Sequence, residues 1–257
     1  MRRVVVAAPF VLVIATVGSC FDWAALSPDA GSALQLQGGC AALGLPTGSA
    51  ISMTGTAFTV SFWMSVDTAA SGPIVWQGGT MLGEAGWSFS IDASEPKIVF
   101  CVGNQDLNPQ CVQAPFMLHH AIHIAMTTAP GTVNFTRSVN LYTLDWTAGQ
   151  TAHTLADTND TAINTWVTTS VFTLGGADVD GGCTRTSPVT LGAVRVWPSA
   201  LGAPALDANF NQDISCAGLA ADFRLDEGAG SVATDCSNSE PALTLVEPFA
   251  WVPSPFP

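Results

Sequence analysis

The chain has 257 residues, of which 48% are hydrophobic and only 11% charged, and its formal net charge is −13. An acidic surface of this kind repels phosphate backbones, which excludes nucleic acid as a partner. An acidic surface is also compatible with binding divalent cations or with a saline environment outside the cell, but the net charge alone does not show which of these applies.

The first nineteen residues have the features of an export signal. Two arginines precede the apolar run 4–17, and two small residues come before Cys20. This pattern describes a secretory signal, and the run is too short to span a bilayer. Segment 17–20 also resembles a bacterial lipoprotein signal, in which the cysteine is diacylated and begins the mature chain. We predict a signal peptide over 1–19 and a tether over 20–32 that is lipid-anchored at Cys20; an ordinary signal peptide cut near a cysteine is the alternative.

The cysteine count agrees with lipid anchoring. Seven cysteines are an odd number for an exported chain. Lipidation of Cys20 leaves six, which can form three disulfides in any of fifteen pairings. The expected pairs are Cys101 with Cys111 as a local hairpin staple, Cys216 with Cys236 at the C-terminal strand, and Cys40 with Cys183. Disulfides of this number would stiffen a loop-rich exported fold.

Turn-forming residues recur every 8 to 12 residues after residue 32, a spacing typical of all-β sandwiches. The clearest strand is 58–66, in which apolar and mostly polar residues alternate as on a half-buried antiparallel strand. Further strands are predicted over 33–37, 74–77, 87–91, 97–102, 120–127, 139–144, 171–174, 189–197, 219–226 and 242–246. A short helix is predicted over 203–210, with Pro204 near its first turn, and a long polar loop over 146–169.

Five segments, taken in order, resemble the laminin-G-like, concanavalin A-like jelly roll of bacterial surface proteins. They are 34–39 (LQLQGG), 58–63 (FTVSFW), 118–122 (LHHAI), 141–142 (LY) and 191–201 (LGAVRVWPSAL). A sixth, 219–235, resembles a segment that often precedes such a domain; here it follows, and we expect it to close the sandwich, the alternative being a remnant of a second module. The resemblance covers about 33–252. It implies an all-β, two-sheet antiparallel jelly-roll sandwich with one short helix, forming one domain over 33–257.

Two acidic segments are candidates for calcium binding. Asp178 and Asp180 lie in a Gly-rich turn, and Asp226 and Asp235 flank the glycines near the C-terminus. Carboxylate oxygens are ligands that Ca²⁺ prefers, and the family resemblance implies calcium because such domains often carry it. The alternative is turn chemistry, since Asp and Gly favour turns without any metal.

Three clustered histidines invite a second metal hypothesis, which strand geometry disfavours. On one strand, His119 and His123 would share a face and lie roughly 13 Å apart, at about 3.3 Å per residue. One ion cannot be held by both. His120 would lie on the opposite face with Ile122, and we expect it to be a packed core histidine.

Aromatic residues supply the candidates for ligand contact. The chain has eight tryptophans and one tyrosine. Trp63, Trp197 and Trp251 lie in strand-like segments and are expected in or near the core. Trp146 and Trp166 lie in the polar loop, where they could stack on a sugar ring or fill a partner's pocket; packing of that loop onto the sandwich is the alternative.

Catalytic motifs are missing from the sequence. It has no G-x-S-x-G, no H-E-x-x-H and no E-x-D-x-x-E strand of the kind found in glucanases with this fold, so paired carboxylates for glycoside hydrolysis have no evident source. We therefore expect a non-enzymatic binding or adhesion module, exported and lipid-anchored at the outer membrane or cell surface, that recognises a glycan or a surface protein. Simple secretion, a divergent glycoside-active enzyme and a purely structural envelope lipoprotein are the alternatives.

Overall fold

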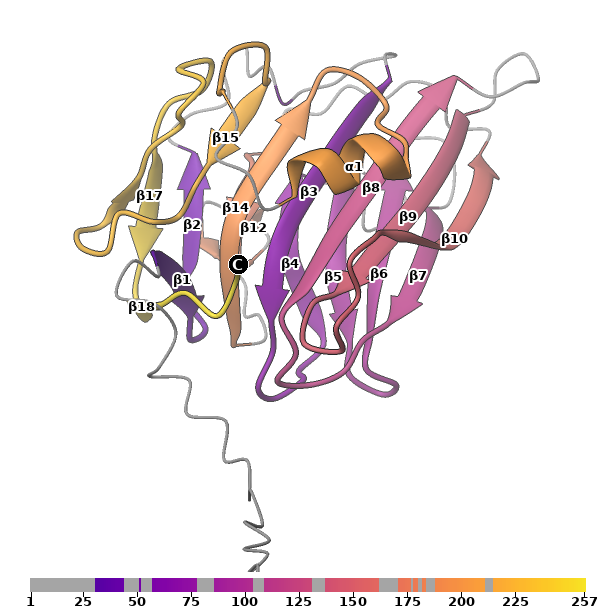
Figure 1. Ribbon diagram of the computed structural model, residues 1–257. Coiled ribbons are helices and arrows are strands. Elements are labelled where there is room, and N and C mark those ends of the chain that lie inside the picture. Colours follow the sequence, from indigo (N-terminus) through magenta and orange to yellow (C-terminus); the bar gives the residue numbers. More distant parts are fainter. Residues whose placement is uncertain are drawn as a thin grey trace, which may run out of the picture.

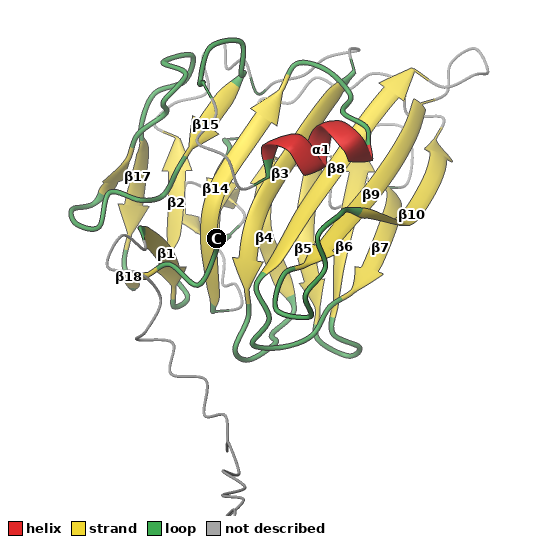
Figure 2. Cartoon of the chain, in the orientation of Figure 1, coloured by secondary structure: helices red, strands yellow, loops and turns green. Residues whose placement is uncertain are grey.

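The computed structural model describes residues 31–43, 51, 57–77, 86–103, 109–130, 137–161, 171–176, 178–179, 182–183, 188–210 and 215–257. Two antiparallel sheets lie face to face (Figure 1), and one short helix lies on the outside of one of them. Figure 2 shows that strands make up nearly all of the regular structure. The predicted all-β sandwich with one short helix is confirmed. The predicted signal peptide and Cys20 lie outside the described residues.

The first sheet contains the strand that the sequence identifies best. Its strands are β1 (Ser32–Leu36), β3 (Phe58–Ser65), β8 (Ile122–Pro130), β9 (Arg137–Asp145), β10 (Thr154–Thr161), β14 (Val189–Trp197), β15 (Ala221–Phe223) and β18 (Phe249–Pro253). They are ordered β10-β9-β8-β3-β14-β1-β18, with β15 paired to β14. β3 is central in this sheet. One of its faces points to the second sheet and the other to the outside of the sandwich.

The second sheet faces the first. Its strands are β2 (Cys40–Leu43), β4 (Gly72–Gln77), β5 (Gly86–Asp92), β6 (Lys97–Gly103), β7 (Gln110–Pro115), β11 (Thr173–Leu174), β16 (Val232–Ala233) and β17 (Leu243–Val246). Their order is β16-β17-β2-β11-β4-β5-β6-β7. A separate short hairpin pairs β12 (Asp178–Val179) with β13 (Gly182–Cys183).

Aromatic rings from both sheets fill the space between them. Phe62 of β3 contacts Phe89 of β5 edge-on, with ring centroids 4.9 Å apart, and Phe89 lies 4.8 Å from Phe100 of β6. All three side chains are fully buried. Edge-to-face contacts of this kind add stability beyond the apolar area that they bury, and they set the distance between the sheets.

Strand β3 is buried on both faces, which differs from the predicted half-buried strand. Its alternation places Phe58 and Phe62 in the main core, but Thr59, Ser61 and Trp63 on the outer face are buried as well. A second small cluster of Trp63, Leu144 and Phe210 lies there. The outer face is therefore a packed layer, made by elements that alternation within β3 cannot reveal.

Helix α1 (Ala203–Asn209) forms part of that layer, as Figure 1 shows. Proline occupies one of its first positions, where the missing N–H costs nothing. Both ends of the helix are bonded to β3. Thr59 Oγ1 donates to Ser199 O (2.8 Å) and accepts from Leu201 N (2.9 Å), and Trp63 Nε1 donates to Phe210 O (3.1 Å). No helix within the described part of the chain is long and apolar enough to cross a membrane.

The predicted long loop over 146–169 is wrong in part, because it contains β10 (Thr154–Thr161). This strand is polar and lies at the edge of the first sheet, so it has no inward apolar row to reveal it. Its side chains also reach across to β7 at the edge of the other sheet: Asp157 Oδ2 accepts from Gln113 N (2.9 Å), and Asn159 Nδ2 donates to Cys111 O (3.5 Å). The polar sequence thus joins the two sheets along one side.

The last forty residues contribute to both sheets. β15 pairs with β14 and β18 with β1 in the first sheet, while β17 pairs with β2 in the second. The disulfides between described side chains are Cys101–Cys111, which joins the paired strands β6 and β7, and Cys216–Cys236 in the C-terminal segment. The Cys183 side chain lies outside those described, as does the expected Cys40–Cys183 bond.

Candidate functional site

A pocket of about 280 Å³ opens on the outer face of the first sheet. Its floor is set by strand register, because Ser65 of β3 lies directly opposite Thr190 of β14. Two residues further along the same strands, Trp63 lies opposite Gly192. Since residues two apart on a strand share a face, the hydroxyl floor of the pocket lies beside the aromatic layer around Trp63.

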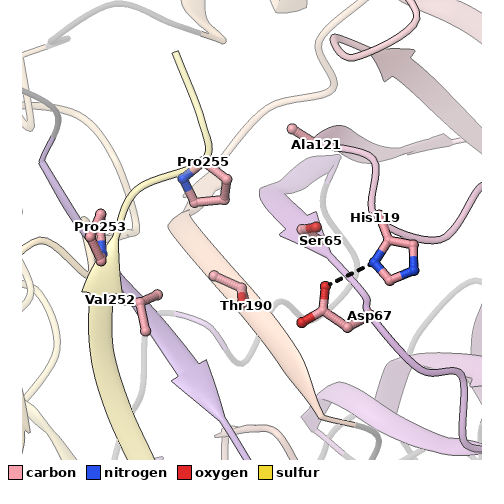
Figure 3. A pocket seen from close by; sticks show the side chains of 8 residues that line it. All are labelled: Ser65, Asp67, His119, Ala121, Thr190, Val252, Pro253 and Pro255. Carbon is pink, nitrogen blue, oxygen red and sulfur yellow. Dashed lines mark hydrogen bonds and ion pairs between the residues drawn. The ribbon is translucent and has the colours of Figure 1, made fainter. Parts of the chain in front are cut away.

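The walls come from parts of the chain that are distant in sequence (Figure 3). Asp67, just after β3, and His119, in the turn before β8, stand on one side, with His119 Nδ1 3.3 Å from Asp67 Oδ1. Val252, Pro253 and Pro255 stand on the other side. Asp67 and His119 are well exposed, at 64% and 70% of their side-chain surface. The pocket therefore offers a carboxylate, an imidazole and two hydroxyls to a ligand.

His119 has an unusual backbone conformation for a histidine. Its φ is +62°, in the left-handed region that most L-residues avoid, and its N–H donates to Val66 O at 2.9 Å. The predicted strand 120–127 in fact begins at Ile122. His119 therefore lies in a turn, and the turn aims its ring at Asp67.

Trp146 lies next to the pocket. It follows β9, and its backbone N–H donates to the carbonyl of Ala121, a pocket-lining residue, at 3.0 Å. Trp146 is 39% exposed, and the centroid of its ring lies 6.3 Å from that of Phe210. Trp146 thus has one part packed on the outer layer and one part available to solvent. Trp166 lies outside the described residues.

The packed core histidine is His123, so the expectation for His120 was wrong. His120 is only partly buried and bonds Asp145 Oδ2 at 2.7 Å. His120 precedes the strand, which begins at Ile122. His123 is 2% exposed, because it faces the outer layer and packs there on Trp63 and Phe210. Its Nδ1 lies 2.7 Å from His153 Nε2, and His153 Nδ1 lies 2.7 Å from Asp207 Oδ1 on α1.

Burial controls the protonation of His123 and His153. Desolvation holds the pKa of His123 well below its usual value, and the positive charge of Arg195 acts in the same direction, as a charge on His153 would. Desolvation also lowers the pKa of His153, although the hydrogen bond and charge of Asp207 oppose it. Both rings are therefore neutral at pH 7 and serve as packing and hydrogen-bonding groups.

A second polar cluster lies where β15 meets β14. Asp222 is fully buried and bonds Arg195 Nε at 3.3 Å, with Arg224 Nε 3.7 Å away. Burial raises the pKa of Asp222, while the two arginines oppose the rise. Asp222 also lies close to Cys216 and Cys236 in the way metal ligands do, but both sulfurs form the disulfide and are not free to bind an ion.

Of the four carboxylates suggested for calcium, the structure describes the side chains of Asp226 and Asp235. Asp235 accepts backbone N–H groups from Asp222, Ser237, Ser239 and Glu240. Burial alone would raise the pKa of Asp235, but these bonds and that of the Ser237 hydroxyl hold it below its usual value. Asp235 thus organises a turn, and Asp226 is exposed. The Asp178 side chain and Asp180 lie outside the described part.

Sequence reasoning missed most of the pocket. It singled out His119 and Trp146, but not Asp67, Ser65, Thr190 or the C-terminal prolines. The residues that line the pocket come from four segments, which only the sheet register and the course of the tail bring together. A local pattern that would identify them is absent, because each segment by itself is an ordinary strand end or turn.

Comparisons with known proteins agree with the fold. Residues 38–206 match the Laminin_G_3 model, described as the concanavalin A-like lectin/glucanases superfamily. A protein of Bacteroides ovatus ATCC 8483 superposes with a TM-score of 0.61 at 18% identity; the match covers 88% of this chain but only 61% of the other. No curated protein matches the sequence.

Two other solved structures resemble this chain less. A heptameric SAP-like pentraxin from Limulus polyphemus has a TM-score of 0.49 at 10% identity, covering 88% of this chain and 96% of its own. The CBM40 module of the Ruminococcus gnavus IT-sialidase has a score of 0.47 at 12% identity, covering 68% and 95%. The family match, by contrast, spans well over half of the sequence. The chain belongs to the Laminin_G_3 family of the concanavalin A-like lectin/glucanases superfamily.

Proposed function

We propose that this protein is a non-catalytic glycan-binding module and that the pocket on the outer face of the first sheet holds the sugar. The observation that carries the proposal is the grouping of Asp67, His119, Ser65 and Thr190 around one opening, with Trp146 bonded to its edge. Carboxylates and hydroxyls are hydrogen-bonding partners for sugar hydroxyls, and an exposed indole offers a face on which a sugar ring can stack.

The family and one structural relative support the same class of ligand. The superfamily description includes lectins, and the description of the Bacteroides ovatus protein proposes carbohydrate binding. The lining of the pocket, all of it described, contains a single carboxylate. Glycoside hydrolysis generally needs two carboxyl groups across the scissile bond, so this pocket fits binding better than hydrolysis.

The charge of the site favours neutral sugars over acidic ones. Asp67 is exposed within the pocket, and the chain carries 20 acidic side chains against 7 basic ones. A sialic or uronic acid would bring its carboxylate against Asp67 in a negative field, which costs binding free energy. Neutral hexoses have no such penalty, and their hydroxyl groups can donate hydrogen bonds to the Asp67 carboxylate.

A glycan array tests the proposal with residues 32–257, with and without calcium. We expect binding to neutral glycans, weakened at least about fivefold in Asp67→Asn and Trp146→Ala, the loss typical of a contact worth more than 1 kcal/mol. His119→Asn is a third variant, since asparagine tolerates the left-handed conformation.

Val246→Ala is the matched control. Val246 is a 50% exposed apolar residue of β17 in the other sheet, and its truncation should leave binding unchanged. Binding of sialylated glycans alone, or equal binding by all variants, would contradict the proposed site. Binding that needs calcium would direct attention to Asp178 and Asp180. Hydrolysis of the bound glycan would instead favour an enzyme, and no binding at all would favour a structural envelope protein.

We further propose that the module is exported and held at the cell surface or outer membrane by lipid on Cys20. The support is the residue pattern of positions 1–20 and the six cysteines left for disulfides. Two or more acyl chains on one cysteine would give stable anchoring, whereas one chain binds weakly. Intact-mass analysis of membrane-extracted protein tests this, and an unmodified Cys20 would contradict it.

A further inference from the structure

The C-terminal residues 254–257 lie across the outer face of the first sheet. Figure 1 shows this tail leaving β18 and crossing toward β14. Ser254 N donates to Gly31 O at 2.8 Å, and Phe256 N donates to Ser254 Oγ at 3.2 Å. Pro253 and Pro255, which alternate with these bonded residues, line the pocket. The wall of the pocket therefore depends on how the tail is held.

An aromatic contact fixes the far end of the tail. The Phe256 ring stacks on Trp63 with centroids 5.6 Å apart and planes 27° from parallel. Beneath it lies Gly192, and a Cβ at that position would come within 2.6 Å of the Phe256 ring. Glycine at 192 thus leaves a slot in the sheet surface that the ring of Phe256 fills.

The slot and the pocket floor are neighbours by register. Gly192 lies opposite Trp63, and Thr190 lies opposite Ser65, two residues along the same two strands. Phe256 therefore contacts the sheet beside the pair Ser65 and Thr190 that forms the pocket floor, and Pro255, the preceding residue, lines the pocket.

From this geometry we infer that Phe256 is the positioning residue of the glycan site: its ring, seated over Gly192 and Trp63, holds Pro253 and Pro255 as one wall of the pocket. The inference rests on the proposed function. It concerns a part of the chain beyond residues 38–206, so it goes beyond what the family match covers. Phe256 does not line the pocket and acts through its neighbours.

The physical effect is preorganisation. Each proline has a nearly fixed φ, so the tail has few conformations once its two ends are held. A wall that is already in place costs a ligand no ordering entropy on binding. Without the ring contact, Ser254 still bonds Gly31, but Pro255 is free to leave the opening.

Two variants disturb the anchor from opposite sides. Phe256→Ala removes the ring, and Gly192→Ala adds a methyl group beneath it without changing the tail. The probe is the neutral oligosaccharide that gives the strongest array signal with the parent protein, titrated by calorimetry. We expect both variants to weaken its Kd about tenfold or more and Phe256→Tyr to restore most of the affinity. Pro257→Ala, an exposed neighbour in the same tail, is the matched control.

Hydrogen exchange separates release of the tail from unfolding. In both anchor variants, the amide of Phe256 should exchange faster, while the amide of Ser254 and those of β3 and β14 keep their protection. Parent-like affinity in Phe256→Ala and Gly192→Ala would overturn the inference and leave the proposed function standing. If the parent protein binds no glycan, the proposed function fails, and the inference falls with it.

Discussion

A buried hydrogen-bonded chain of His123, His153 and Asp207 joins the first sheet to α1. It lies beside Trp63, whose ring centroid is 5.0 Å from that of His123. Charged and titratable groups lie around His123 on three other parts of the chain: Arg195 on β14, His153 just before β10, and Asp207 on α1, which bonds His153. Arg195 and the apolar surroundings oppose a positive charge on His123. The hydrogen-bonded group of His123, His153 and Asp207 is therefore most stable when both imidazole rings are neutral.

Acidification should therefore destabilise the fold. Both histidines have lower pKa values in the folded state than in the unfolded chain, so the unfolded chain binds more protons. Their contribution to stability is fully present above the unfolded pKa of about 6.5 and is lost as the pH falls below it, at up to about 1.4 kcal/mol per pH unit for each ring. Thermal melts between pH 8 and 5 measure this.

His123→Gln tests the assignment, because glutamine can bond His153 but does not titrate. We expect a lower melting temperature at pH 7.5 and a shallower decline toward pH 5. Exposed His119 supplies the comparison, and His119→Asn should keep the parent slope. Equal slopes in His123→Gln and the parent would contradict the role of the buried pair.

At the scale of elements, contacts with the first sheet stabilise α1 more than its own backbone hydrogen bonds do. Seven residues are too few for an isolated helix to be stable. Its last carbonyls accept hydrogen bonds from sheet side chains: Arg195 Nη1 reaches Asn209 O at 3.0 Å, and Trp63 Nε1 reaches Phe210 O at 3.1 Å. These donors satisfy backbone groups that the end of a helix leaves without partners.

Loss of the Asp207 carboxylate should loosen the helix. Asp207 accepts from both the backbone and the ring of His153, at 2.7 Å each. Asp207→Ala leaves those buried groups unsatisfied, and we expect a loss of about 1–3 kcal/mol in unfolding free energy. Urea unfolding measures it. Ala208→Ser, exposed on the same helix, is the control, and similar losses in both variants would mean that the bond to His153 contributes little.

At the scale of the whole molecule, the family match and the folded unit differ in extent. The match ends at residue 206, yet β15, β17 and β18 pair with strands of both sheets beyond that point. The Cys216–Cys236 disulfide lies within the same region. Strands from beyond the family match therefore belong to the same two sheets as strands within it.

Removal of the C-terminal region should prevent folding. A chain of residues 31–214 would leave the edges of β1 and β2 unpaired and expose the core beneath β15. Unpaired edges of this kind promote aggregation. We expect the shortened chain to be insoluble or to lack a cooperative thermal transition, while 31–257 melts cooperatively; circular dichroism and gel filtration compare them. A soluble, cooperatively folding 31–214 would contradict this account.

The sequence by itself determined the class of fold. Alternation in 58–66, regular turn spacing and ordered family-like segments predicted the sandwich, the short helix and most strands, because burial between two sheets imposes a period of two on each inner strand. Edge strands such as β10 bury no continuous row of apolar residues and were missed for that reason.

Only the tertiary structure decided which residues form the site. Ser65 meets Thr190 through register, Asp67 meets His119 through a left-handed turn, and Pro255 reaches them because Phe256 fills the slot over Gly192. The outer burial of Trp63 and His123 likewise depends on α1 and the tail. Contacts between segments far apart in the chain leave no local period, so no pattern within one strand can show them.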